Sequence, residues 1–261
     1  DCPLPKDNKA AIGEMKKILS QLADKPNERL SDSLALLGTA SALYDSATGW
    51  PKLRAPLKSR TAITTRGAQH MITRVLEPEV MDTAEEASSY DAMDHSTPNA
   101  AFVRRLSELG VHGRVLDIGC GPGHIPVLLC ETLPEVHVVG VDLADHMLRY
   151  AEAKRRDSVH AARLAFQRCD AKGLPFPSAS FDTVCSNTIL HHIQDPRPFL
   201  REAARVLKPG GVLLIRDLMR PWSQGRVAEL VALHAGGGTA DQQELFRASL
   251  CAAFTPFELR A

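Results

Sequence analysis

The stretch that decides the fold runs from Val115 to Gly123 and reads V-L-D-I-G-C-G-P-G. Its first four residues have the character of a buried β-strand, and glycines follow at positions 119, 121 and 123. Residues 138–142 (V-V-G-V-D) follow at the distance that one helix and one further strand require. A strand, a glycine-rich turn, a helix and a second strand that ends in Asp predict the first half of a nucleotide-type fold.

The glycine spacing indicates which ligand such a fold would bind. A dinucleotide fingerprint, G-x-G-x-x-G, would require glycine at position 124, where this chain has His124. Glycines at alternate positions still let the backbone approach a ligand closely. Asp117 suits a cationic group such as the ammonium of a methionine-type ligand. The spacing therefore favours S-adenosylmethionine and disfavours a nicotinamide-dependent oxidoreductase.

The run from Asp117 to Gly123 resembles the first motif of the class I S-adenosylmethionine-dependent methyltransferases. More narrowly, it is similar to the type 11 domain of the small-molecule branch related to ubiquinone and menaquinone C-methyltransferases. The resemblance implies that the glycine loop wraps the methionine part of the cofactor and that the second-strand acid bonds the ribose hydroxyls. The cofactor-binding residues that it implies here are Asp117, Gly119, Cys120, Gly121, Gly123 and Asp142.

Other residues are expected at the adenine end of the same site. Leu143 and Met147 either flank the adenine or belong to the core. The resemblance implies that Asp170 and Ala171, after the third strand, contact the adenine amino group, and an Asx-turn is the alternative for Asp170. For Asp142, the alternative is an N-cap of the following helix.

At the methionine end, Asn187 leaves the fourth strand and would face the reaction centre. Tyr90 belongs to an N-terminal segment that related enzymes fold over the cofactor, and it would stack or bond near the methionine carboxylate. His191 and His192 are candidates for a general base, with a structural role as the default. Because adjacent residues point in different directions, no metal site is predicted for them.

The implied activity is methyl transfer by in-line displacement to a small-molecule acceptor, at C, N or O. A sulfonium is already activated, so positioning and exclusion of water can supply most of the rate, and a base is needed only if the acceptor must lose a proton. A non-catalytic S-adenosylmethionine-binding module without a complete acceptor site is the alternative.

Composition excludes several other classes. The 261 residues carry no formal net charge, so no general attraction to nucleic acid or to a membrane surface is expected. The six cysteines form no C-x-x-C pair, and no apolar run is long enough to span a membrane. These features predict a cytoplasmic protein with reduced thiols and without a bound metal. The chain does not begin with Met, which indicates a fragment or a processed product.

Residues 1–70 are expected to form a helical extension and a basic linker of unknown role, separate from a methyltransferase domain at 71–261. Leu34 and Leu37 belong to the second of two predicted helices within residues 1–45. Residues 46–76, including Arg74, have six basic side chains and no acidic one, whereas 77–94 are acidic. The basic run either binds an anionic partner or is a solvated linker that faces its acidic neighbour.

The core at 101–217 alternates strands and helices, which predicts a doubly wound, mostly parallel α/β sheet of Rossmann-like order 3-2-1-4-5. Residues 218–261 read as helical, so the usual terminal antiparallel strands are expected to be missing and the fifth strand to be an exposed edge. The expected strands are 114–118, 137–141, 164–169, 182–187 and 212–215, and the expected helices are 101–109, 125–133, 146–155 and one from 195.

Overall fold

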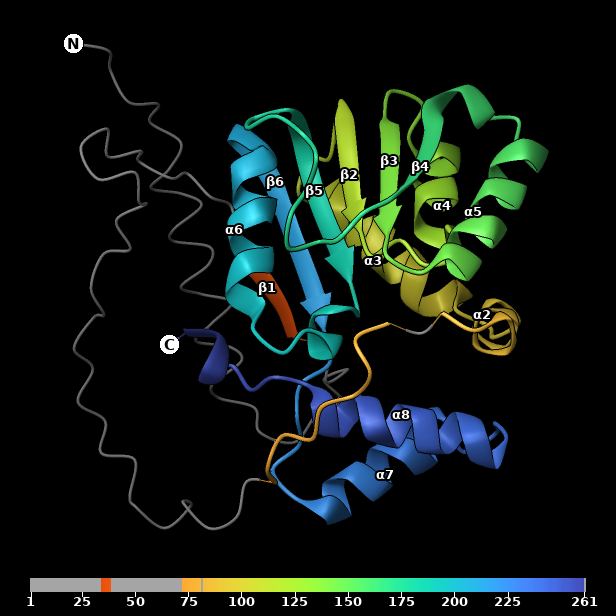
Figure 1. The fold of residues 1–261 in the computed structure, drawn as a ribbon, viewed down its shortest axis with the longest axis vertical. Helices are drawn as coiled ribbons and strands as arrows, with labels where there is room; N and C mark the ends of the chain where they lie inside the picture. The colour runs from red at the N-terminus through yellow and green to blue at the C-terminus, as the bar shows by residue number, and fades with distance from the viewer. Residues whose placement is uncertain (1–33, 39–71, 81, 261) are drawn as a thin grey trace. The chain divides into compact units, whose positions relative to one another are not determined.

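The computed structural model describes residues 34–38, 72–80 and 82–260. They form one six-stranded sheet with helices on both faces (Figure 1). Five strands are parallel to their neighbours and follow the predicted order 3-2-1-4-5. In chain order these strands are β2 (Arg114–Ile118), β3 (His137–Asp142), β4 (Leu164–Arg168), β5 (Phe181–Asn187) and β6 (Leu207–Asp217).

The sixth strand, β1 (Leu34–Gly38), pairs antiparallel with the C-terminal half of β6. The prediction of a helix through Leu34 and Leu37 is therefore wrong over these five residues. So is the prediction that the fifth parallel strand is an exposed edge, because β1 satisfies the hydrogen-bonding groups along that edge. Two leucines at helical spacing are a weak local signal, and a long-range backbone ladder overrides it. The remainder of the predicted extension lies outside the described residues.

The two faces of the sheet bury different helices. Helices α3 (Ser96–Glu108) and α4 (His124–Thr132) pack on one face, where Val115 and Val138 point. Helix α6 (Pro196–Val206) packs on the other face, against Leu116 and Ile118. Successive residues of a strand alternate between faces, so β2 supplies both cores at once. Helix α5 (Asp145–Asp157) lies beside β4 and α4.

Strand β6 begins five residues earlier than predicted, immediately after α6. Leu207 pairs with Phe181 and Val212 with Thr183, so the ladder is irregular between these pairs. Gly210 has φ +78°, and a Cβ on Gly211 would lie 2.6 Å from the carbonyl oxygen of Asp182. These two glycines therefore form a bulge inside the strand, ahead of the predicted start at residue 212.

No strand follows β6 in the described part of the chain, as predicted. Helices α7 (Gln224–His234) and α8 (Ala240–Ala252) form a hairpin below the sheet (Figure 1). None of the described helices is long and apolar enough to cross a membrane. The short elements are α2 (Ala84–Asp91), η1 (Ala161–Arg163), η2 (Leu190–His192) and η3 (Glu258–Arg260).

Residues 72–80, called the strap from here on, run between the α7–α8 hairpin and the end of the sheet (Figure 1). Arg74 anchors the strap by donating hydrogen bonds to four carbonyl oxygens, those of Ala252, Gln194, His191 and Ile193. Its guanidinium also lies 3.6 Å from the centre of the Phe254 ring. The basic residue predicted to lie in a solvated linker therefore has a structural role, whereas residues 39–71 are outside the described part of the chain.

Candidate functional site

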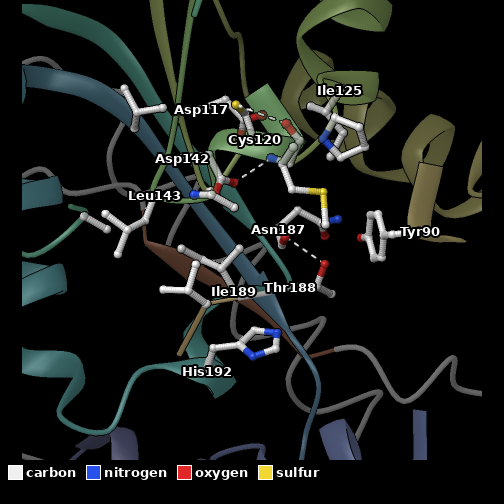
Figure 2. Close-up of a pocket in the computed structure, with 18 of the residues that line it drawn as sticks. Tyr90, Asp117, Cys120, Ile125, Asp142, Leu143, Asn187, Thr188, Ile189 and His192 are labelled. Atoms are coloured by element: carbon white, nitrogen blue, oxygen red, sulfur yellow. Dashed lines mark hydrogen bonds between the residues drawn. The ribbon is translucent and has the colours of Figure 1, made fainter. Parts of the chain in front are cut away.

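A cleft of about 1100 Å³, including its open mouth, lies at the carboxyl ends of β2, β3 and β5 (Figure 2). This is the place at which open α/β sheets bind ligands. Most of the residues selected from the sequence line it, and two do not: Gly123 and His191. Those that line it are Tyr90, Asp117, Gly119, Cys120, Gly121, Asp142, Leu143, Met147, Asp170, Ala171, Asn187 and His192.

The glycine-rich turn is fixed to the neighbouring strand. The backbone N–H groups of Gly119 and Cys120 both donate to the carbonyl oxygen of Val141, at 2.8 and 3.0 Å. Gly119 has φ +75°, and a Cβ there would lie 2.3 Å from Cγ2 of Ile189. Both the backbone conformation and the close approach of Ile189 require glycine at this position.

Gly123 serves packing rather than the cleft. It is the N-cap of α4 with φ +83°, and a Cβ would lie 2.9 Å from Cβ of Ala151 and 3.0 Å from the Phe166 ring. The third glycine of the motif therefore lets α4 start in close contact with α5 and β4, and it does not line the cleft.

Asp142 lines the cleft, and it is not the N-cap that the sequence offered as the alternative. Its Oδ2 accepts the N–H of Gly121 at 2.8 Å, and its Oδ1 accepts the N–H of Ala144 at 2.9 Å. The N-cap of α5 is Ala144, so Asp142 forms a turn ahead of the helix without being its cap. Burial raises the pKa of this carboxyl group. Each oxygen accepts one N–H and keeps a second lone pair, so the carboxylate can still accept from two hydroxyls.

Asp117 is buried at the cleft with few hydrogen bonds to the described residues. The residue is 1% exposed, and its Oδ1 accepts only a weak bond from Sγ of Cys185 at 3.6 Å. Its Oδ2 is buried and has no hydrogen-bond partner in the described structure. Burial, more than any neighbouring charge, raises the pKa of Asp117 to about 7. A buried acceptor without a donor is costly, and a ligand cation in the cleft would supply the missing donor.

Asp170 and Asn187 already have protein partners. Oδ1 of Asp170 accepts the N–H of Lys172 at 2.8 Å, which is the Asx-turn considered from the sequence, and this residue still lines the cleft. Oδ1 of Asn187 accepts from Nε of Arg216 at 2.7 Å. This contact fixes the orientation of the Asn187 amide at the end of β5.

The side of the cleft next to α2 and α3 holds polar residues that sequence reasoning missed. The Tyr90 ring stacks on His95, with ring centres 4.6 Å apart, and His95 meets the edge of His124 at 6.2 Å. Burial raises the pKa of Tyr90 and lowers that of His124. Asn99 and Thr188 complete this side. The sequence analysis selected Tyr90 but not the other four, which are His95, Asn99, His124 and Thr188. These four belong to no motif, and only the fold brings them together.

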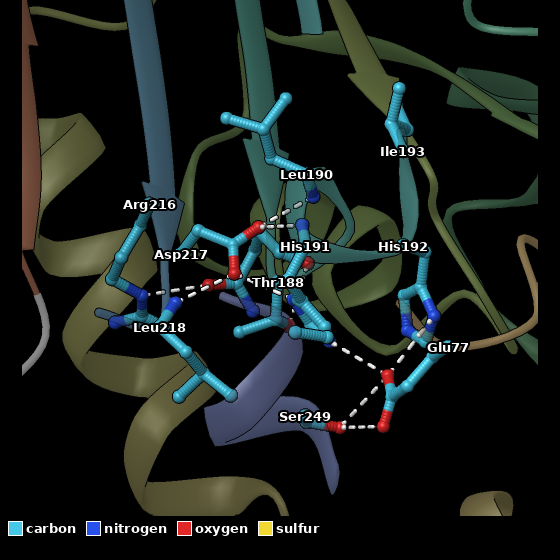
Figure 3. A network of polar contacts seen from close by, with 12 residues as sticks. Glu77, Thr188, Leu190, His191, His192, Ile193, Arg216, Asp217, Leu218 and Ser249 are labelled. Carbon is cyan, nitrogen blue, oxygen red and sulfur yellow. Dashed lines mark hydrogen bonds and ion pairs between the residues drawn. The ribbon is translucent and has the colours of Figure 1, made fainter. Parts of the chain in front are cut away.

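The two adjacent histidines occupy different environments (Figure 3). His191 is 3% exposed, and its Nδ1 lies 2.6 Å from Oδ1 of Asp217, away from the cleft. His192 lines the cleft, and its Nδ1 lies 3.4 Å from Oε2 of Glu77, a strap residue. Ser249 on α8 donates to both oxygens of Glu77, at 3.1 and 3.3 Å.

Glu77, His191 and His192 offer ligand atoms within 4.8 Å of one another. The expectation that adjacent histidines point apart is wrong here, because their rings stack with centres 4.2 Å apart and planes at 36°. One nitrogen of each ring lies close to Oε2 of Glu77, at 3.8 Å for Nε2 of His191 and 3.4 Å for Nδ1 of His192.

Acidic residues around α2 pair with the body of the domain. Glu79 pairs with Lys172 and Asp91 with Lys154, while Asp82 accepts the N–H of His146 at 2.9 Å. These partners come from α5 and from the loop after β4. The acidic stretch therefore faces the sheet domain at these positions, and the idea that it faces the basic linker fails for them.

The family described as "Methyltransferase domain" matches residues 116–215, which hold the strands and turns just described. A demethylmenaquinone methyltransferase of Listeria welshimeri is 32% identical over 166 residues, covering 59% of this chain and 70% of that protein. The chain belongs to the S-adenosylmethionine-dependent methyltransferase family. The matched residues 116–215 include Asp117, Asp142 and Asn187, which line the cleft from β2, β3 and β5.

Other members of the methyltransferase family differ in their named activities. A 27-O-demethylrifamycin SV methyltransferase of Amycolatopsis mediterranei is 39% identical over 41% of this chain and 39% of its own length. An O-methyltransferase of Aspergillus sclerotiorum is 32% identical over 62% and 64%. The chain spans less than two thirds of the length of these two relatives. A putative S-adenosyl-L-methionine-dependent methyltransferase of Methanococcus maripaludis shares the fold, with a TM-score of 0.50 at 19% identity over 62% of this chain and 77% of that one.

Proposed function

We propose that this chain binds S-adenosylmethionine in the cleft and transfers its methyl group to a small-molecule acceptor. The observation that carries the proposal is the unpartnered Oδ2 of Asp117, which is buried at the cleft and lacks a donor among the described residues. The ammonium of a methionine moiety is a donor of the required charge. Family membership supports the same cofactor.

The remaining roles follow from position in the cleft. Asp142 would accept from the ribose hydroxyls through its two remaining lone pairs, and the turn at Gly119 and Gly121 would let the backbone approach the methionine. Leu143 and Met147, with Asp170 and Ala171, would surround the adenine. Tyr90 and Asn187 would lie at the methionine end.

When bound, the cofactor supplies an activated methyl group on a sulfonium. The protein's part is to orient the acceptor, to exclude water and, where the acceptor carries a proton, to accept it. Tyr90, His95, Asn99 and Thr188 supply polar contacts for an acceptor on the α2–α3 side of the cleft. The cytoplasmic location and the absence of a nucleic-acid partner stay predictions from the sequence.

The test is binding of S-adenosylhomocysteine, with NAD as the competing ligand. At 100 times its dissociation constant, S-adenosylhomocysteine should add about 2.7 kcal/mol to the free energy of unfolding.

Asp142→Ala should weaken binding by about 1.5–3 kcal/mol, because it removes hydrogen bonds made by a charged group. Asp145→Ala is the matched control, since the Asp145 side chain is 53% exposed, does not line the cleft and pairs with Arg168. Stabilisation by NAD alone would refute the proposal. Consumption of S-adenosylmethionine with a panel of hydroxyl, amine and carbon acceptors then tests the transfer itself.

A further inference from the structure

His192 lines the cleft, and one of its ring nitrogens faces protein acceptors. Its Nδ1 lies 3.3 Å from the carbonyl oxygen of Pro78 and 3.4 Å from Oε2 of Glu77. A carbonyl and a carboxylate can only accept, so Nδ1 must carry the proton of the neutral ring. The lone pair is then on Nε2, which has no hydrogen-bond partner within the described structure.

Burial and the neighbouring His191 keep the His192 ring neutral at pH 7. Burial, and then the neighbouring His191, lower the pKa of His192 to about 4. Burial opposes protonation of His191 too, but Asp217 and Glu77 raise the pKa of that ring. Arg74 faces the same group and donates to the His191 carbonyl oxygen. The pKa values of the two adjacent imidazoles are thus moved in opposite directions, and the neutral His192 ring keeps a lone pair that can accept a proton.

Glu77 holds its place through contacts that do not involve the cleft. Ser249 on α8 donates to both of its oxygens, and the strap that carries it is anchored three residues earlier by Arg74. The base and its carboxylate therefore come from different segments, η2 and the strap, and α8 supports them (Figure 3). The Pro78 carbonyl oxygen accepts the Nδ1 proton, and the Glu77 carboxylate 3.4 Å away is placed to stabilise the imidazolium that forms.

We propose that His192 is the base that takes the proton of an acceptor hydroxyl, and that Glu77 is the residue that positions His192. The proposal rests on the methyl-transfer function proposed above and assigns its substrate class. A hydroxyl gains nucleophilicity as it loses its proton, whereas a neutral amine attacks through its own lone pair. The acceptor O–H bond breaks as the new O–CH3 bond forms, the proton goes to Nε2, and the electron pair of the broken methyl–sulfur bond stays on sulfur. The imidazolium returns its proton to water after the ether leaves.

Nitrogen-15 NMR of the histidine rings, without any ligand, tests the orientation. In the wild-type protein we expect His192 to be the Nδ1–H tautomer at pH 7. Glu77→Ala should shift it toward the Nε2–H form, and Ser249→Ala serves as a second variant should Glu77→Ala fail to fold. Asp82→Ala is the control, because Asp82 pairs with Nδ1 of His146 at 3.1 Å and should change that ring alone. An Nε2–H tautomer in the wild-type protein would overturn the proposal, as would a His192 ring that neither variant alters.

Catalysis gives the second readout. With a hydroxyl acceptor found in the panel, His192→Gln should lower kcat by about 100-fold or more, while the Kd for S-adenosylhomocysteine stays within about twofold of wild type. A hydroxyl acceptor methylated equally fast by His192→Gln would overturn the role of His192. Failure of S-adenosylhomocysteine to bind the wild-type protein would instead refute the methyl-transfer function, so the two failures can be told apart.

Discussion

Replacing Asp117 by Asn should stabilise the unliganded protein and weaken its ligand binding. Asp117 is fully buried, one of its oxygens has no partner among the described residues, and its pKa in the folded state is about 7 against a reference value of 3.8. The difference of about 3 units, at about 1.4 kcal/mol per unit, corresponds to a folding cost of about 4 kcal/mol above pH 7. Asn has nearly the same shape and does not ionise, so Asp117→Asn should remove this cost.

The sign of the effect follows from which state binds the proton. Below pH 4 the carboxyl group is protonated in both the folded and the unfolded chain, and the cost is absent. As pH rises from 3.8 toward 7, the unfolded chain ionises first and stability falls; above 7 the cost is constant. The advantage of Asp117→Asn in urea denaturation should therefore grow from about 1.5 kcal/mol at pH 5 to about 4 kcal/mol at pH 8.

Ligand binding should show the opposite preference. A proton on Asp117 competes with the ligand ammonium, so the wild-type Kd for S-adenosylhomocysteine should be about tenfold higher at pH 6 than at pH 8. Asp117→Asn should raise the Kd at pH 8 by about 10- to 150-fold and remove most of this pH dependence. Titration calorimetry measures both effects, and Asp145→Asn serves as the exposed control. A variant that is less stable than wild type at pH 8 and binds with unchanged affinity would refute the reasoning.

Three further changes test the turn, the segment around α2 and the strap. Gly119→Ala places a Cβ against Ile189 at a backbone φ of +75°, so it should lower the free energy of unfolding by about 1–3 kcal/mol and abolish S-adenosylhomocysteine binding. An unchanged melting temperature would contradict this prediction. Asp91→Asn breaks the pair with Lys154 and should speed amide exchange in α2 by up to about fivefold in low salt, with no difference at 1 M salt. Arg74→Met leaves four carbonyl oxygens without their donor and should destabilise the domain by about 2–4 kcal/mol in urea, while unchanged stability would mean that water replaces the guanidinium.

The parallel sheet could be predicted because its signals are local. An apolar run gives a strand, glycine gives the turn, and Asp195 before Pro196 starts a helix. Strand 114–118 has the predicted bounds, and the predicted order 3-2-1-4-5 is confirmed. The predicted fifth strand begins at residue 212, whereas β6 begins at Leu207 because the bulged backbone of residues 207–211 still continues the strand beside β5.

The contacts of the strap could not be predicted, because their partners are distant in the chain. Arg74 meets Ala252 across 178 residues, and Glu77 meets Ser249 across 172. A run of charges indicates that a segment will find counter-charges or carbonyls but not which ones. The pairing of β1 with β6 has the same origin, since an edge strand can be completed by any extended segment that reaches it.

The sequence identified most of the residues that line the cleft, but it did not show which of the selected residues serve packing instead. Gly123 has the motif spacing, yet it serves the contact between α4 and α5. His191 and His192 were equivalent candidates, and only the positions of Asp217 and Glu77 separate the buried ring from the one that lines the cleft. Such distinctions depend on which side chains converge in space, and sequence spacing carries no information about that.

The Oδ2 of Asp117, which has no partner within the described structure, is the strongest physical argument that the cleft binds a cation. Whole domains are stable by about 5–15 kcal/mol, so a cost of about 4 kcal/mol at one residue is a large fraction of the total. Asp142, by contrast, is partly compensated by two backbone N–H groups within the protein. The protein therefore supplies hydrogen-bond donors to Asp142 but leaves Oδ2 of Asp117 without one among the described residues. A ligand that carries an ammonium group near Asp117 and hydroxyl groups near Asp142 fits this arrangement.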